Sequence, residues 1–305
     1  MNPSASPTRP AGGELLSAGF MKKLERLRLR ARRQYPGASM GERMSRARGS
    51  GLEFADYKEY SPGDDFRNID WKVYARLDEL VVRTFETEEN LPVTILLDAS
   101  ASMDFGGGEQ SKWRMGCQLA AALGYAALSS RDALKVALFS ERLRETFDAA
   151  RGRGLARDLF ALLDTAAPSG ASDFPGAFRA AGLQQGRAGL YIVISDFCAR
   201  AQLAEALKSL VHRGHELVGL HLVDPLEADP GLEGEVDLED PETGELIPMT
   251  VKGETLERYR AAFEASCRDI AKAHAACNAL YLRLSTDDPV EQLVLHRFRV
   301  EGLLG

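Results

Sequence analysis

The sequence predicts an α/β domain built on a doubly wound, mostly parallel sheet with helices on both faces. From residue 91 onward, apolar runs of strand length alternate with helical segments, and this alternation is typical of parallel sheets. The runs are nearly continuous in their apolar character, as expected for strands that are covered on both sides. In such folds, the loops at the carboxyl ends of the strands form the ligand site.

The elements follow one another in a regular order. Buried strands and the helices between them are expected at residues 93–97, 112–130, 134–139, 153–165, 175–184, 190–194, 200–213 and 217–223. Residues 143–147 follow the preceding strand after only three residues, and so short a link requires an antiparallel edge strand. A helix at 254–276, an edge strand at 280–284 and a helix at 288–299 complete the domain, which spans residues 91–305.

The part before residue 91 has a different composition. Residues 1–12 are rich in Ser, Pro, Gly and Ala, which is typical of a disordered leader. Residues 13–90 are expected to form a basic helix and an N-terminal extension, with the helix over residues 14–33 because its apolar residues recur near a period of 3.6. The extension then continues with a connector, a strand, a turn, a short helix and a second strand, expected at 34–50, 52–60, 61–64, 69–77 and 80–86.

Charge is unevenly distributed along the chain, whose formal net charge is −7. The segment 22–48 is strongly basic, and ten Lys or Arg residues stand against two Glu between residues 21 and 50. Such an arm can bind nucleic acid or an anionic membrane surface, or it can pack on the acidic body of its own protein. We expect self-packing or solvation of this arm, with binding to nucleic acid or a membrane surface as the alternative.

A second charged segment is acidic. Residues 224–246 contain ten acids and no bases, with Pro241 and Gly244 in a turn-like stretch. This composition predicts an acidic β-hairpin near residues 230–252. The hairpin is either a solvated protrusion or an arm that docks on a basic partner surface.

The composition excludes several classes of protein. No run approaches the roughly 18–20 apolar residues that a membrane span needs, and the N-terminus lacks the apolar core of a signal peptide. A cytoplasmic location is therefore expected. Neither the cysteines nor the histidines show the spacing of a zinc site.

Polar residues follow two of the expected buried strands. Asp98, Ser100 and Ser102 come directly after the strand at 93–97, and Asp196 follows the strand at 190–194. If the strand order reverses between these two strands, both carboxylates face the same crevice.

A third loop offers Ser172 beside Asp173, although either residue could serve only as a helix N-cap. Carboxylate and hydroxyl oxygens suit a divalent cation, with Mg²⁺ expected and Mn²⁺ or Ca²⁺ as substitutes. Because most of these groups are neutral, a bound ion would keep positive charge and could accept a carboxylate from a partner protein. In the alternative interpretation, Asp98 caps its own turn, the serines bond to the backbone, and no ion binds.

The same loop argues against the common enzyme classes. A phosphatase with an aspartate nucleophile would need an acid two residues after Asp98, where Ser100 stands. The chain has no Gly-x-Ser-x-Gly around the serines and no P-loop. We therefore expect a non-enzymatic protein, with a metal-dependent phosphohydrolase as the alternative.

The order Asp98, Ser100, Ser102, Ser172 and Asp196 resembles the metal-ion-dependent adhesion site of the von Willebrand factor A-type fold. The resemblance implies that these five residues hold the ion. The family usually has Thr where Ser172 stands, and serine keeps the hydroxyl but loses the methyl that restricts the rotamer.

The segment 60–71, with the sequence YSPGDDFRNIDW, resembles the bacterial domain of unknown function 58 family, as do Ala75-Arg76 and the acidic run 240–245. The resemblance covers roughly residues 40–300. It implies a protein-interaction role, adaptor or chaperone-like, with a MoxR-type AAA+ ATPase as the partner and a further client protein.

Overall fold

The structure is a computed structural model, and it describes residues 14–31, 52–64, 66–87, 91–106, 111–149, 152–183, 188–199, 203–240 and 244–305. The chain divides into two compact units. The main unit combines residues 1–33 with residues 91–305, and the second unit spans residues 34–90. The leader expected at 1–12 lies outside the described residues, and so does the part of the basic segment from residue 32 onward.

A six-stranded sheet forms the centre of the main unit, in the order β10-β7-β6-β3-β4-β5. Its strands are β3 (Pro92–Asp98), β4 (Ala133–Phe139), β5 (Leu143–Ala149), β6 (Leu190–Ser195), β7 (Glu216–Val223) and β10 (Leu280–Ser285). Only β5 is antiparallel to its neighbour, while the other pairs are parallel. The predicted α/β class, the mostly parallel sheet and its antiparallel edge strand are thus confirmed.

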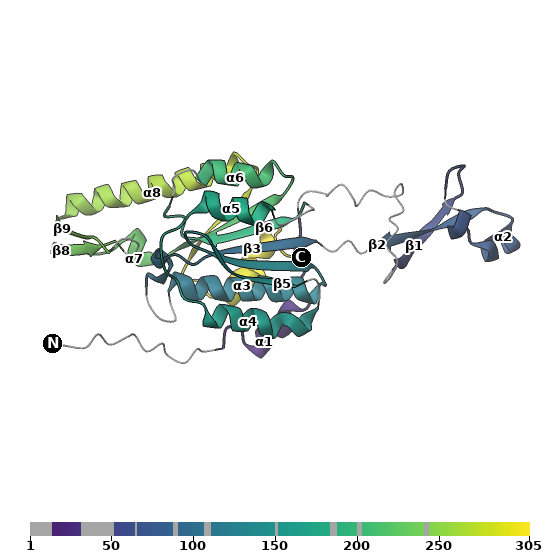
Figure 1. Ribbon diagram of the computed structural model, residues 1–305, viewed down its shortest axis with the longest axis horizontal. Helices are drawn as coiled ribbons and strands as arrows, with labels where there is room; N and C mark the ends of the chain where they lie inside the picture. Colours follow the sequence, from purple (N-terminus) through teal and green to yellow (C-terminus); the bar gives the residue numbers. More distant parts are fainter. Residues whose placement is uncertain are drawn as a thin grey trace. The chain divides into compact units, whose positions relative to one another are not determined.

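Helices cover both faces of this sheet (Figure 1). One face carries α1 (Ala18–Leu24), α3 (Lys112–Ser129) and α4 (Ala156–Thr165), and the other carries α5 (Phe174–Leu183), α6 (Leu203–Val211) and α8 (Gly253–Ala275). The shorter elements are η2 (Ala101–Asp104), η4 (Arg153–Leu155), α7 (Pro225–Ala228), α9 (Val290–Gln292), the π-helical turn η5 (Leu293–Arg297) and α10 (Phe298–Val300). Because parallel strands need crossovers, these helices follow from the strand order itself.

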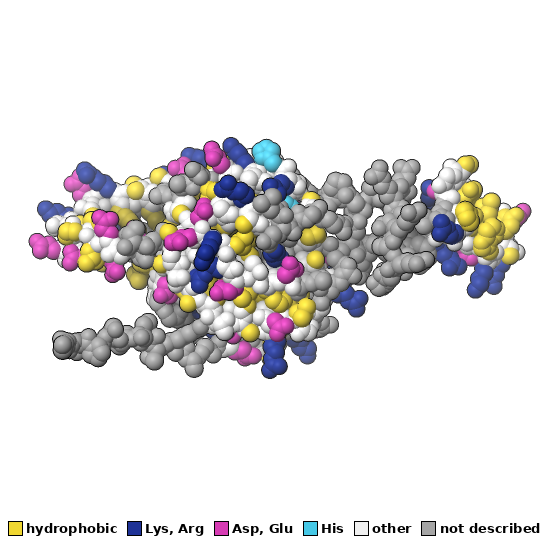
Figure 2. Space-filling view, in the orientation of Figure 1, with side chains coloured by type: hydrophobic (Ala, Val, Ile, Leu, Met, Phe, Trp, Pro, Cys, Tyr) yellow, Lys and Arg dark blue, Asp and Glu magenta, His cyan; other side chains and the backbone are white. Residues whose placement is uncertain are grey.

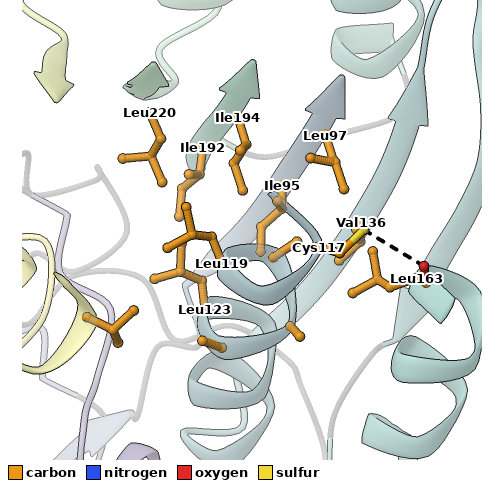
Figure 3. Close-up of a cluster of buried hydrophobic side chains, with 14 of the residues drawn as sticks. Ile95, Leu97, Cys117, Leu119, Leu123, Val136, Leu163, Ile192, Ile194 and Leu220 are labelled. Atoms are coloured by element: carbon orange, nitrogen blue, oxygen red, sulfur yellow. Dashed lines mark hydrogen bonds between the residues drawn. The ribbon is translucent and has the colours of Figure 1, made fainter. Parts of the chain in front are cut away.

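Alternate residues of each central strand belong to two different cores. Ile95 and Leu97 of β3 pack with α3 (Figure 3). Leu96 between them packs on the side of α5 and α6. Helix α3 lies very close to the sheet and to α4, since a Cβ on its Gly124 would meet Leu159 Cδ2 at 2.7 Å. Near the start of α3, a Cβ on Gly116 would meet Leu97 Cδ1 at 2.9 Å, so the helix begins close to the carboxyl end of β3.

The N-terminal segment differs from the prediction. Helix α1 spans only Ala18–Leu24, and it packs on the main unit instead of belonging to an extension over 13–90. The reason is visible in the sequence, because Leu27 to Arg30 alternate apolar and basic residues with the period of a strand. Arg28 exchanges two backbone hydrogen bonds with Gly305, of 3.0 and 2.9 Å. The described part of the basic segment therefore packs on its own protein.

The second unit is a small hairpin with one helix. β1 (Leu52–Glu59) pairs antiparallel with β2 (Val81–Thr87), and η1 (Phe66–Asn68) and α2 (Trp71–Leu77) lie between them in the chain. Asp70 joins the three parts, since it caps α2 and accepts hydrogen bonds from Arg83 Nε at 2.8 Å and Tyr57 Oη at 3.0 Å. The Arg83 guanidinium, helped by the Tyr57 and backbone donors, lowers the pKa of Asp70 to about 2 against the effect of desolvation.

Large apolar side chains remain exposed on this second unit (Figure 2). Phe66 is 66% exposed, Trp71 60% and Leu77 65%. Two strands and one short helix cannot enclose a core that would bury them. The unit therefore presents an apolar surface, which is typical of interaction sites.

The acidic segment forms an antiparallel hairpin of β8 (Gly234–Glu239) and β9 (Leu246–Val251). Its acidic side chains and its apolar ones, such as Leu238 and Ile247, are exposed (Figure 2). The expected turn includes residues 241–243, which lie outside the described residues. No described helix combines the length and the hydropathy of a bilayer-spanning segment.

The first prediction concerns Asp132, which is buried and accepts a hydrogen bond from Leu91 N at 3.0 Å. Burial raises its pKa to about 6, against the opposing effects of the Leu91 bond and Arg28. An unfolded aspartate titrates near pH 4, so the free energy of unfolding should fall as the pH rises from about 4 to about 6. Asp132→Asn keeps the acceptor and should therefore raise the free energy of unfolding at pH 7 by roughly 1–2 kcal/mol.

Urea denaturation of both proteins at pH 4 and pH 7 measures this difference. The gain should disappear at pH 4, where the wild-type carboxyl is protonated. Glu145→Gln, which removes an exposed carboxylate from the edge strand β5, is the control and should change the free energy of unfolding little at either pH. A gain for Asp132→Asn of equal size at both pH values would contradict the prediction.

Candidate functional site at the carboxyl edge of the sheet

The strand order reverses between β3 and β6, as the sequence interpretation required. The chain moves from β3 to β4 and β5 on one side, and then returns to β6 on the other side of β3. Leu97 and Ile194 are register partners, so Asp98 and Ser195 end the two strands side by side. The Ser195 hydroxyl donates to Asp98 Oδ2 at 2.7 Å. Ligand sites of doubly wound folds lie at such a reversal.

Asp98 collects donors from three loops although its side chain is fully buried. Besides Ser195, the backbone N–H of Ser100 donates to Oδ1 at 2.9 Å. The Ser172 hydroxyl lies 2.9 Å from Oδ1 and 2.8 Å from Oδ2. Asp98 thus caps its own turn, as the alternative interpretation has it, but it also draws together hydroxyls from two other loops.

The remaining predicted residues continue the same network. The hydroxyl oxygens of Ser100 and Ser102 are 3.0 Å apart, and Ser102 also hydrogen-bonds Asp196. The five residues singled out in the sequence therefore lie in one connected, largely buried group. Two backbone bonds of Ala99, to the carbonyl oxygen of Phe139 and from the N–H of Ser169, each 2.7 Å, hold the first loop in place.

The structure shows which of the two polar residues in the loop before α5 caps that helix. Asp173 Oδ1 accepts from Gly176 N at 3.0 Å and is the capping group. Ser172 instead faces Asp98 with its hydroxyl. The serine therefore belongs to the site, and its neighbour belongs to the helix.

Lys112 is a site residue that sequence reasoning missed. Its fully buried ammonium lies 2.7 Å from Asp196 Oδ2 and 2.5 Å from Glu227 Oε1, and it lies 5.6 Å from the centre of the Phe105 ring. A sequence signal existed, because Lys112 is the first residue of α3. The helix dipole disfavours a cation there, so a lysine at this position suggests a specific acidic partner.

Two other missed residues had weaker signals. Ser195 is the one polar residue of the strand β6, and a hydroxyl at the last buried position of a strand indicates a local acceptor. Glu227 lies in α7, where it forms a capping box with Asp224. The four-residue run from Asp224 to Glu227 predicts that capping role but not the contact with Lys112.

The charges of the site act on one another at short range. Burial and the nearby Asp196 carboxylate raise the pKa of Asp98 to about 6, despite the donors it receives. Burial also disfavours ionised Asp196, but the Lys112 ammonium outweighs it and lowers the pKa of that carboxyl. Lys112 has the reverse balance, since its two carboxylate partners outweigh desolvation and raise its pKa.

The donor set fits a hard cation only if hydroxyls take part. In the described part of the chain, no group of three or more His, Cys, Asp or Glu is placed to hold a metal ion. The oxygens around Asp98 come instead from four serine hydroxyls that lie within hydrogen-bond distance of it or of each other: Ser172, Ser195, Ser100 and Ser102. An all-oxygen set of this kind matches Mg²⁺ or Ca²⁺ and not Zn²⁺.

A comparison with known families now identifies the class. The sequence matches the family described as "Protein of unknown function DUF58" over residues 56–273. This match covers well over half of the chain, so the protein belongs to the DUF58 family, and the predicted resemblance is confirmed.

The chain is also similar to individual proteins of known sequence or structure. The chain is 27% identical over 278 residues to uncharacterized proteins of Mycobacterium bovis and Mycobacterium tuberculosis, which covers 90% of this chain and 87% of theirs. It is also similar to the crystal structure of the conserved hypothetical protein BatB from Bacteroides thetaiotaomicron, with 16% identity and a TM-score of 0.45. That match covers 70% of this chain and 99% of the BatB chain.

The second prediction concerns Ser195→Ala. The change removes one donor from the buried Asp98 carboxylate, and it removes the acceptor of the 2.8 Å bond from Phe197 N. We expect the free energy of unfolding at pH 7 to fall by about 2 kcal/mol, because buried charged acceptors and buried N–H groups are costly to leave unpaired. Chemical denaturation measures the loss.

Ser209→Ala is a matched control, since the Ser209 hydroxyl donates only to the Ala206 carbonyl of its own helix, at 2.7 Å. It should cost less than about 1 kcal/mol. Equal losses for the two variants would mean that Ser195 is an ordinary packing residue.

Proposed function

We propose that the protein is a von Willebrand factor A-like, non-enzymatic module that binds a partner protein through a divalent cation, with Mg²⁺ as the ion. Five residues would hold the ion, directly or through water: Asp98, Ser100, Ser102, Ser172 and Asp196. The observation that carries the proposal is their convergence in one buried network at the reversal point of the sheet. The strand order supports the fold assignment, and the hydroxyl-rich donor set supports the ion.

The chemistry of the donors explains why such a site would bind and not catalyse. Serine hydroxyls are neutral, so a divalent ion held by them and Asp98 would keep positive charge and supply an attachment point for a carboxylate. Ser100 stands where an aspartate phosphatase needs its acid, and its hydroxyl is buried against Ser102. Asp98 itself is fully buried and accepts hydrogen bonds from three donors, the Ser100 N–H and the Ser172 and Ser195 hydroxyls, which suits orienting a ligand set better than attacking a substrate.

Surfaces of both units are suited to a protein partner. A cleft beside the first loop is lined by Ala101, Asp104, Phe105, Pro168 and Glu239. It therefore connects the loop that carries Ser100 and Ser102 with the acidic hairpin. The exposed apolar face of the second unit adds an interaction surface of another kind.

The partner we propose is a MoxR-type AAA+ ATPase, with the chain acting as an adaptor or chaperone-like assembly factor toward a client protein. The support is the family resemblance together with the acidic hairpin, which suits a basic docking surface. A pull-down of the ATPase with and without EDTA tests the proposal. A complex that survives EDTA unchanged would contradict a metal-bridged contact.

The third prediction concerns the ion itself. Mg²⁺ and Mn²⁺ should bind to the wild-type protein in calorimetric titrations, and Asp98→Ala should weaken binding by at least about tenfold because a charged ligand is lost. Asp104→Asn changes a carboxylate on the same loop that is exposed and outside the network, and should alter the affinity less than about threefold.

Two outcomes would contradict the proposed function. Absence of binding at millimolar ion would leave Asp98 as a loop cap. Turnover of phosphoesters that is lost in Asp98→Ala would instead indicate the metal-dependent phosphohydrolase.

A further inference from the structure

The ammonium of Lys112 is an unusual group to find inside this fold. Its side chain is fully buried, and it occupies the first position of α3, where the helix dipole disfavours a cation. A buried charge persists only with close partners of opposite sign. Lys112 has two such partners, Asp196 and Glu227, which come from different parts of the chain.

These contacts satisfy Asp196 on both of its oxygens. Oδ2 accepts from Lys112 at 2.7 Å, Oδ1 accepts from the backbone N–H of Cys198 at 3.0 Å, and Ser102 provides a further bond. Asp98 differs, because each of its described donors is neutral. Of the two aspartates at this edge, Asp196 is therefore paired with a cation and Asp98 is not.

We propose that Lys112 is a resident cation that fills a second acidic pocket, formed by Asp196 and Glu227, and so confines a divalent ion to the side of Asp98. Lys112 is then a positioning residue, since it acts on the ion through Asp196. The part of this inference that concerns the ion beside Asp98 in the wild type rests on the proposed function. The existence of the second acidic pocket does not rest on it.

The geometry of the second pocket predicts which ion would replace the ammonium. The two carboxylate oxygens lie 2.7 and 2.5 Å from the Lys112 nitrogen. Without the ammonium these two carboxylates would lack a counter-charge, and carboxylates from separate parts of a fold suit the flexible coordination of Ca²⁺ better than the strict octahedral geometry of Mg²⁺. Removing the ammonium should therefore create a site that prefers Ca²⁺ to Mg²⁺.

The ion pair between Lys112 and Glu227 also anchors the segment that leads into the acidic hairpin. Glu227 belongs to α7, which precedes β8, and its carbonyl accepts a 2.7 Å bond from the Tyr259 hydroxyl of α8. An ion in the second pocket would anchor the same segment, because it would bind the same carboxylates. The hairpin should thus keep its attachment in a variant loaded with Ca²⁺.

The test is calorimetric titration of Ca²⁺ and Mg²⁺ into the wild type and Lys112→Met, which keeps an unbranched side chain but removes the charge. Lys112→Met should bind Ca²⁺ at least about tenfold more tightly than the wild type, with a smaller gain for Mg²⁺. The double variant Lys112→Met/Glu227→Gln should lose most of this gain. Equal Ca²⁺ affinity in the wild type and Lys112→Met would overturn the inference.

A stability measurement keeps the test decisive if the variant folds poorly. Ca²⁺ should raise the thermal midpoint of Lys112→Met far more than that of the wild type, because an ion that binds only the folded state stabilises it. A variant that stays unfolded in Ca²⁺ would overturn the inference.

The variant Asp98→Ala/Lys112→Met separates this inference from the proposed function. If it binds Ca²⁺ as Lys112→Met does, the second pocket exists independently of Asp98. If the wild type binds no ion but Lys112→Met does, the proposed function is contradicted and the inference about the second pocket stands.

Discussion

The structure of the site depends on one buried carboxylate, that of Asp98. It lies where the strand order reverses, and it has no exposed surface. Such a group is tolerated only when donors surround it, and here the donors come from three loops that would otherwise be independent. The positions of Ser100, Ser172 and Ser195 therefore follow from the need to satisfy Asp98. The same arrangement of oxygens is what makes the edge suitable for a hard cation.

A second constraint is the charge balance of this edge. Asp98, Asp196 and Glu227 would repel one another if all were ionised without a cation between them. Lys112 offsets two of these charges from within the fold, and the cost of its own burial is met by both partners. The pKa of Asp98 is raised and that of Asp196 is lowered, because only Asp196 has the ammonium beside it.

The sequence predicted most of the sheet and the five proposed ligands, because buried parallel strands have a clear apolar pattern and their carboxyl ends meet at one edge. It did not predict the partners of Lys112, since Glu227 is 115 residues away and meets it only through the packing of α7. The extent of α1 was wrong for a related reason. Leu24 and Leu27 fit a helical period, but the helix ends at Leu24, and Leu29 pairs with Leu304 at the distant C-terminus.

The central claim is that the ion binds beside Asp98 while Lys112 stays bonded to Asp196 and Glu227. Crystals soaked in Mn²⁺ and measured at the manganese absorption edge test it most directly. The account predicts an anomalous peak beside Asp98 and the serine hydroxyls, with Lys112 still bonded to Asp196 and Glu227. A peak between Asp196 and Glu227 with the lysine displaced, or no peak at saturating ion, would contradict it.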